Sequence, residues 1–210
     1  MDNFSISAFL YGIPIGFIFS FGLGPVFFTL IQSSVTYGFR KALYIIIGVV
    51  NADLIMLAVA YSGIALLLPK DIDVSFWVEL IGGILLLALG IGTLLKKSNT
   101  EVKPIGAARL IIQNILKGFF LNILNPGNFM EWVAMAGILK TKYHYTPAEN
   151  VSFFTGAIIM VIITEFFIAY FADKLRYIMT EKIIRYITIF TGLILLCFGI
   201  WLLSEALIKK

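Results

Sequence analysis

The stretch of sequence that decides the fold is Asn122-Ile123-Leu124-Asn125-Pro126-Gly127-Asn128-Phe129-Met130-Glu131, which sets amides, a proline and a carboxylate inside an apolar run. Pro126 lacks the amide hydrogen of a helical hydrogen bond and clashes with the preceding turn, and it disfavours helical geometry at Asn125. Gly127 lets the backbone unwind at little steric cost. In a bilayer such a break is tolerated only where it packs in protein or lines a wet cavity. The stretch therefore predicts a broken membrane helix with a binding site at the break.

The composition is that of a membrane protein. Of the 210 residues, 60% are hydrophobic and 13% are charged, about half the charged fraction of an ordinary soluble domain. The charges are clustered and leave windows of about 20 apolar residues, the length that crosses a hydrocarbon core. One cysteine and one histidine exclude a disulfide framework and a multi-thiolate metal site. We therefore expect an all-α polytopic membrane protein with no resident metal or cofactor.

Six transmembrane helices are predicted, at residues 4–31, 42–68, 76–95, 118–139, 151–172 and 186–208. The first is interrupted by Pro14 and by the turn that ends in Pro25, and the fourth by Pro126. Within the long basic segment before span four, the four-residue spacing of polar residues over 109–117 predicts a helix that lies at the membrane surface. The three tryptophans, Trp77, Trp132 and Trp201, partly fit the aromatic belts at the two interfaces.

The distribution of Lys and Arg predicts the orientation. The connections after spans one, three and five hold 11 of the 16 basic residues: Arg40, Lys41, Lys96, Lys97, Lys103, Arg109, Lys117, Lys174, Arg176, Lys182 and Arg185. The other side holds Lys70, Lys140, Lys142, Lys209 and Lys210. Because basic residues concentrate in cytoplasmic connections, both termini are expected outside the cytoplasm. The basic pI of about 9.1 then reflects topology and not a nucleic-acid partner.

An internal repeat divides the chain. The segment 83–91 is similar to 192–200 at an offset of 109, Gly48 corresponds to Gly156 at 108, and Pro25 corresponds to Pro126 at 101. Three spans per repeat is an odd number, so the two halves have opposite orientations, as in many secondary transporters. Chance similarity between Leu- and Gly-rich helices is the alternative. We expect one membrane domain over 1–210, with repeats at 4–95 and 118–210 joined by a basic cytoplasmic connection at 96–117. The glycine-rich third and sixth spans could also pair two copies of the chain.

Three acids, Asp53, Glu131 and Glu165, fall inside predicted spans, where no Lys or Arg is found. A carboxylate in the bilayer core is costly and needs a partner or a proton. The expected counter-charge is therefore a proton, a cation or a cationic group of a substrate. The alternative is that some of these acids lie near an interface or accept hydrogen bonds from amides.

The two proline breaks supply the other half of a predicted site. A helix that resumes after Pro25 or Pro126 presents unpaired amide hydrogens and the positive end of its dipole, which suit an anionic group such as a carboxylate. Gly24 and Gly127 would let a ligand approach the backbone. A plain kink eased by neighbouring helices is the alternative. Four amides in the same spans could orient a ligand or bond helices together. They are Asn51, Asn122, Asn125 and Asn128.

Over nearly its whole length the chain resembles the LysE/RhtB superfamily of small amino-acid exporters. The resemblance is carried by Gly24-Pro25, by the segment from Gly48 to Asp53-Leu54, and by Gly118-Phe119, Asn122 and Leu124-Asn125-Pro126. Acids at Asp53 and Glu131 are similar to those of the branch that exports lysine and arginine, where the second is usually Asp. Two features depart from the family pattern: Gly-Leu-Gly-Pro replaces Pro-Gly-Pro at the first break, and Gly127-Asn128 follow the second proline. Both lie beside the expected site and leave the substrate open.

The resemblance implies a secondary exporter of amino acids, basic ones among them, in a bacterial inner membrane, driven by protons through alternating access. Two alternatives stay open: a divalent-cation exporter of the same superfamily, and a non-transporting membrane scaffold or assembly protein. An enzyme is the least expected class, because the sequence shows no nucleophile–base pair.

Overall fold

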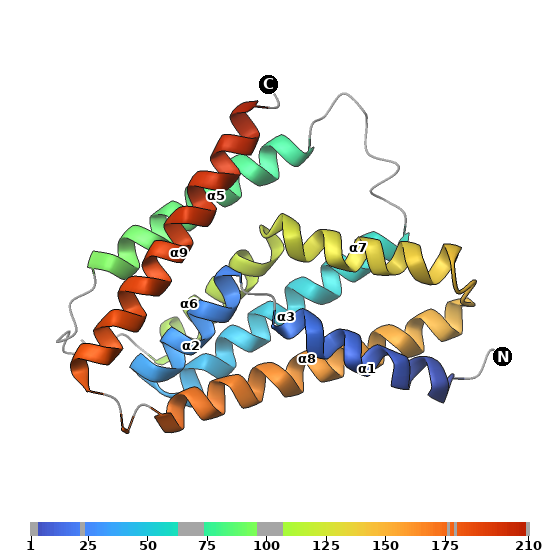
Figure 1. The fold of residues 1–210 in the computed structure, drawn as a ribbon, viewed down its shortest axis with the longest axis horizontal. Coiled ribbons are helices and arrows are strands. Elements are labelled where there is room, and N and C mark those ends of the chain that lie inside the picture. The colour runs from blue at the N-terminus through green and yellow to red at the C-terminus, as the bar shows by residue number, and fades with distance from the viewer. Residues whose placement is uncertain are drawn as a thin grey trace.

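The computed structural model describes residues 4–21, 24–62, 74–95, 107–175, 177–178 and 180–208, which form eight α-helices and no strand (Figure 1). The all-α prediction is therefore confirmed for these residues. The helices are α1 (Ile6–Ser20), α2 (Pro25–Tyr37), α3 (Phe39–Ser62), α5 (Val74–Leu95), α6 (Ala107–Ile123), α7 (Pro126–Thr141), α8 (Pro147–Leu175) and α9 (Glu181–Ile208).

Among the described residues, three helices are long and apolar enough to cross a membrane: α3, α8 and α9. The pair α1 and α2 has the same character when taken together, and its two helices meet at 74°. Shorter apolar stretches lie in α5, at Leu80–Leu95, and in α6, at Leu110–Ile123. By length and composition, three or four crossings follow from the described helices, and the prediction of six spans stays a prediction.

Three helix pairs make the most extensive contacts: α1 with α8, α3 with α6, and α5 with α9. Glycines allow this close packing. A Cβ added to Gly12 of α1 would lie 2.0 Å from the carbonyl oxygen of Phe153 in α8, and one added to Gly48 of α3 would lie 2.0 Å from that of Ile115 in α6. Such small residues let helix backbones approach closely without a hydrophobic driving force between them.

The pair α5–α9 lies at an angle to the other helices (Figure 1). It joins them through a cluster of buried leucines: Leu86 of α5, Leu121 of α6, and Leu195 and Leu202 of α9. The main core lies instead between α1, α3, α7 and α8, where Trp132 is fully buried. An interfacial Trp132 was therefore a wrong expectation. Its indole N–H has a hydrogen-bond partner inside the protein, which removes the need for the wet interface that tryptophan usually seeks.

Two predicted helix boundaries also differ from the structure. Helix α1 continues through Pro14, since neighbouring helices can accommodate a proline in a membrane helix. Helix α6 runs without interruption from Ala107 to Ile123, where we expected a surface helix over 109–117 and a new span from Gly118. The polar residue Gln113 is exposed, whereas Gly118 packs against Ile45 of α3. One face of α6 thus stays on α3 across the expected boundary.

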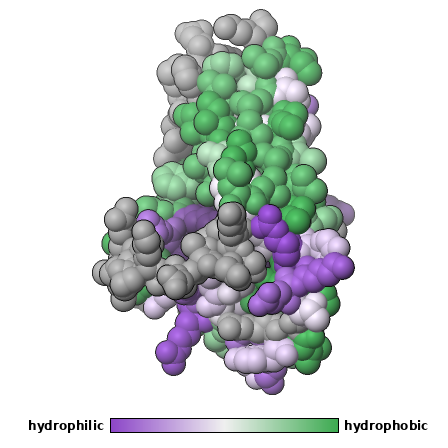
Figure 2. Space-filling model, turned by 90° about the vertical axis from the view of Figure 1, so that its left-hand side faces the viewer, coloured by the Kyte–Doolittle hydropathy of each residue, from purple (hydrophilic) through white to green (hydrophobic). Residues whose placement is uncertain are grey.

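Polar contacts place several helix ends together. The Ser34 hydroxyl near the end of α2 donates to the Ala169 carbonyl near the end of α8, and Arg185 of α9 donates to the carbonyl of Leu94 in α5 at 3.4 Å. In Figure 2, hydrophilic side chains gather in the lower half of the face that is shown, and the apolar surface lies above them. The ends of α2, α5 and α8 are those that carry the basic connections. Which side of the membrane they face stays a prediction.

Candidate functional site

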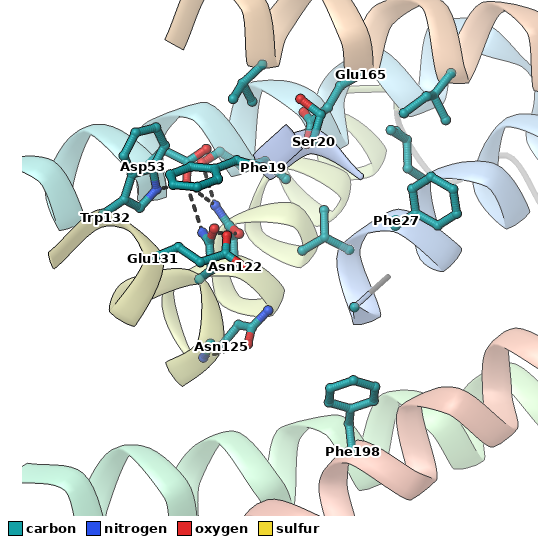
Figure 3. Close-up of a pocket in the computed structure, with 18 residues that line it drawn as sticks. Phe19, Ser20, Phe27, Asp53, Asn122, Asn125, Glu131, Trp132, Glu165 and Phe198 are labelled. Carbon is teal, nitrogen blue, oxygen red and sulfur yellow. Dashed lines mark hydrogen bonds between the residues drawn. The ribbon is translucent and has the colours of Figure 1, made fainter. Parts of the chain in front are cut away.

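A cavity of about 270 Å³ lies at the break between α6 and α7 (Figure 3). Its walls come from α1, α2, α3, α6, α7, α8 and α9. Eight of the site residues predicted from the sequence line it: Gly24, Asp53, Asn122, Asn125, Gly127, Asn128, Glu131 and Glu165. The structure thus brings together all three acids and both breaks from distant parts of the chain.

Asp53 is the centre of a hydrogen-bond network in this cavity. Its side chain is 3% exposed, and its Oδ1 accepts hydrogen bonds from Asn122 Nδ2 at 2.8 Å, Asn128 Nδ2 at 2.9 Å and Trp132 Nε1 at 3.0 Å. Three neutral N–H donors on one oxygen offset part of the cost of burying a carboxylate. Among the described residues, no hydrogen bond is found to Asp53 Oδ2.

The amides are themselves fixed. Asn122 Nδ2 also donates to the Val49 carbonyl of α3 at 3.0 Å, and Asn128 Nδ2 donates to Asn122 Oδ1 at 2.8 Å. These bonds join the last turn of α6 and the first turn of α7 to the middle of α3. The alternative that the acids meet neighbouring amides therefore holds for Asp53, and the network leaves one carboxylate oxygen for a ligand.

The chain restarts as a helix at each proline. Asn125 is the N-cap of α7, and its Oδ1 accepts from the Gly127 amide at 3.1 Å. Gly24 is the N-cap of α2 and supplies no side-chain cap. The first amide hydrogens of a helix have no partner within the helix, so both helix starts offer N–H groups beside the cavity that Gly24 and Gly127 line.

The two glutamates differ in their surroundings. Glu131 of α7 is partly exposed. Glu165 of α8 is 5% exposed, and its Oε2 has no hydrogen-bond partner among the described residues. Figure 3 shows both side chains directed into the cavity with Asp53. Among the described residues that line the cavity there is no Lys, Arg or His, so this part of the chain gives the cavity carboxylates and N–H donors without a fixed cation.

Two predicted site residues are not brought to the cavity wall. Asn51 is exposed and donates to the Ile47 carbonyl of its own helix at 2.7 Å, so it bonds within α3 and does not orient a ligand here. Pro25 begins α2 and is not among the residues that line the cavity. Pro126 begins α7.

Sequence reasoning missed several lining residues, among them Phe19, Ser20, Trp132 and Phe198. Trp132 lies four residues after Asn128, so the two share a helix face, and this spacing could have revealed it. The ring of Phe19 meets the Trp132 ring edge-on at 5.0 Å. No sequence signal marks Phe19 or Phe198, since both are apolar residues in apolar helices.

Comparisons with known proteins concern the chain as a whole. The family model described as "LysE type translocator" matches residues 17–206. The chain is 27% identical over 202 residues to the "Putative amino acid efflux protein YcgF" of Bacillus subtilis (strain 168), covering 93% of this chain and 95% of that protein. It is also 27% identical over 173 residues to the "Chemotactic transduction protein ChpE" of Pseudomonas aeruginosa, covering 81% and 85% respectively. No solved structure matches.

Proposed function

The chain belongs to the LysE type translocator family, and from this membership we propose that it is a secondary exporter of amino acids in a bacterial inner membrane. The observation that carries the proposal is the cavity at the α6–α7 break, which combines a buried carboxylate with the start of a helix. The name of the Bacillus relative, an amino acid efflux protein, supports the same substrate class.

An amino acid carries an ammonium and a carboxylate, and the cavity offers a complement to each. Asp53 Oδ2 and Glu131 are suited to bind the ammonium or a coupling proton, because no basic side chain among the described residues lines the cavity to neutralise them. The starts of α2 and α7 suit the carboxylate, since helix N-termini attract anions. The volume of about 270 Å³ is just below the range of about 300–1,000 Å³ that holds drug-sized ligands and fits a small metabolite.

Alternating access in a 3+3 inverted repeat is the proposed mechanism. The helix pairs support it: Ser5 and Phe9 meet Ser152 and Gly156, so α1 and α8 run parallel. Gly48 and Asp53 meet Ile115 and Asn122, so α3 and α6 also run parallel.

The third pair runs the other way. Gly83 approaches Gly199 while Gly90 approaches Gly192, so α5 and α9 are antiparallel. Six spans that alternate in direction would give this pattern: spans one and five are parallel, spans two and four are parallel, and spans three and six are antiparallel. Inverted repeats of this kind rock around a fixed central site. From the distribution of Lys and Arg, we propose that both termini lie outside the cytoplasm.

A divalent-cation exporter is less well supported. Hard cations take several oxygen ligands, but Asp53 Oδ1 already faces three N–H donors, which repel a cation. A scaffold or signalling role has one observation in its favour, the similarity to the chemotactic transduction protein. Such a role does not require buried acids around a cavity, so neutralising them should leave it intact.

The test is uptake into inverted membrane vesicles under an imposed proton gradient. Radiolabelled lysine, arginine, a neutral amino-acid mixture and a divalent cation would be offered to vesicles with the wild-type chain or Asp53→Asn at equal abundance. Gradient-dependent accumulation of an amino acid, lost in the variant, is the expected result. Accumulation of the cation alone would move the protein to the cation branch. No accumulation of any of them would overturn the transporter proposal.

A further inference from the structure

We propose that Glu165 is the residue that takes up and releases the coupling proton, while Asp53 stays ionised as a fixed part of the substrate site. This division of roles rests on the proposed function and deepens it. It is argued from the different surroundings of two acids that line one cavity (Figure 3).

Glu165 lies on α8 in the middle of the protein and is 5% exposed. Its Oε2 accepts no hydrogen bond from any described residue. An ionised carboxylate that is buried, unpaired and without hydrogen bonds costs so much free energy that it neutralises instead. Glu165 therefore needs a proton whenever nothing positive is in the cavity.

Asp53 has the opposite surroundings. Although it is equally buried, three N–H groups from Asn122, Asn128 and Trp132 point at its Oδ1. These groups can only donate, and bonds to an ionised acceptor are stronger than neutral ones. Asn122 and Trp132 are both buried and held by the packing of α6 and α7. The network thus supports a permanent negative charge at Asp53.

The groups around Glu165 explain how a substrate could displace its proton. Helix α8 packs against α1, α2 and α3. The residues that α1 and α2 contribute to the cavity are apolar, glycine or Ser20, and none titrates. The titratable groups that line the cavity with Glu165 are Asp53 of α3 and Glu131 of α7.

With only acids as neighbours, Glu165 can lose its proton when a cationic group enters the cavity and supplies the missing positive charge. A substrate ammonium that binds beside Asp53 from the cytoplasm would therefore release the Glu165 proton to cavity water. After the substrate leaves on the other side, a proton from that side would replace it. One proton thus moves inward for each substrate molecule exported.

The Ser20 hydroxyl is a possible hydrogen-bond acceptor for the protonated carboxyl group of Glu165. Its hydroxyl hydrogen is donated to the Gly16 carbonyl at 2.8 Å, so its lone pairs are what Ser20 presents to the cavity that it shares with Glu165 (Figure 3). A hydroxyl whose hydrogen is already used can accept from a protonated carboxyl but cannot donate to an ionised one.

The test separates gradient-driven accumulation from exchange in proteoliposomes. Radiolabelled lysine and leucine would be followed in two modes: against an imposed pH gradient, and as exchange with the same unlabelled amino acid at equal pH on both sides. Glu165→Gln is expected to lose accumulation but to retain exchange, which needs no net movement of protons. Glu149 is a partly exposed acid at the start of the same helix, and its side chain bonds Thr146. Glu149→Gln is the matched control and should retain both modes. Glu165→Asp should restore part of the accumulation.

Two results would overturn the assignment: wild-type accumulation in Glu165→Gln, or loss of exchange together with accumulation, which would make Glu165 part of the substrate site. An infrared measurement keeps the assignment testable if the wild-type chain carries neither amino acid, an outcome that counts against the proposed function alone. The C=O stretch of a protonated carboxyl should appear in the pH-difference spectrum of the wild-type protein and of Asp53→Asn, and vanish in Glu165→Gln. Its persistence in Glu165→Gln would overturn the proposal.

Discussion

The breaks at Pro25 and Pro126 use the same backbone device and differ in their side chains. Phe21 lies four residues before Pro25, and Phe27 lies two residues after it. The corresponding positions around Pro126 are Asn122 and Asn128. The rings of Phe21 and Phe27 lie 6.3 Å apart, whereas the two asparagines bond each other and Asp53.

The difference teaches that interrupting a helix and building a site are separate properties. Both helix starts border one cavity, but among the described residues the second start is the one whose side chains donate to a carboxylate. In the proposed exporter, the starts of both helices bind the substrate carboxylate. The side chains at Pro126 recognise further polar groups of the substrate, and the side chains at Pro25 supply an apolar wall. Mutations that exchange these properties test the comparison.

The largest effect is expected from Asp53→Asn. The substitution replaces the carboxylate by an amide, whose NH2 group must take the place of one carboxylate oxygen. It also removes the negative charge that binds the substrate ammonium. Breaking such a buried, hydrogen-bonded charge site costs about 3 kcal/mol or roughly hundredfold in transport. Vesicle uptake at equal membrane abundance measures it. Export within a few-fold of the wild type would contradict the central role of Asp53.

The next effect is on stability and concerns the helix contacts that hold the second break. A Cβ on Gly118 would lie 2.2 Å from the Ile45 carbonyl oxygen, so Gly118→Ala should push α6 from α3 and destabilise the protein by about 1–3 kcal/mol. Thermal unfolding of the purified protein in detergent measures the shift. Gly137→Ala, where nothing lies within 4 Å of the new Cβ, is the control. Equal unfolding temperatures in the two variants would be evidence against this packing.

A direct comparison of the two breaks comes from Asn128→Leu and Phe27→Leu. The first removes the hydrogen bonds to Asp53 and Asn122, which is worth about 1–2 kcal/mol or roughly tenfold in substrate affinity. The second exchanges one apolar side chain for another in the wall and should change affinity much less. Concentration dependence of uptake measures both. A larger loss from Phe27→Leu would reverse the assignment of the two breaks.

The smallest effects concern the helix caps. Asn125→Ala removes the acceptor of the Gly127 amide and should destabilise α7 by about 1 kcal/mol. Gly24→Asn adds a side-chain acceptor at the start of α2, where φ is −93° and a side chain is tolerated, so a gain of a few tenths of a kcal/mol is expected. Unfolding temperatures again measure both, and a loss in Gly24→Asn would show that the first break cannot be capped like the second.

The sequence predicted those parts of the site that carry a physical cost. Acids without basic partners and a proline with amides in an apolar run are expensive in a membrane, so their presence marked Asp53, Glu131, Glu165 and the break at Pro126. The same reasoning predicted Asn51 in the site. The free-energy cost of a polar amide in an apolar helix does not reveal which face of α3 the side chain lies on.

The remaining parts depend on tertiary packing. Phe198 reaches the cavity from α9 because that helix packs against α5 and the leucine cluster, which no local pattern reveals. Trp132 was expected in an interfacial belt, since its burial depends on Asp53, which lies 79 residues away. The continuous helix α6 was not predicted, because the spacing of its polar residues also fits a surface helix. The packing of its other face against α3 cannot be seen in the sequence.

The contact of α1 with α8 has a consequence for the synthesis of the chain. The hydrogen bond from the Ser5 amide to Ser152 Oγ, 2.9 Å long, joins residues 147 positions apart, and a ribosome adding about 5–20 residues per second needs roughly 7–30 s to cover that distance. During that interval Gly12 and Gly16 have no α8 to pack against, and lipid or an insertion factor must cover them. A nascent chain that stops before α8 should therefore be a substrate for membrane quality-control proteases.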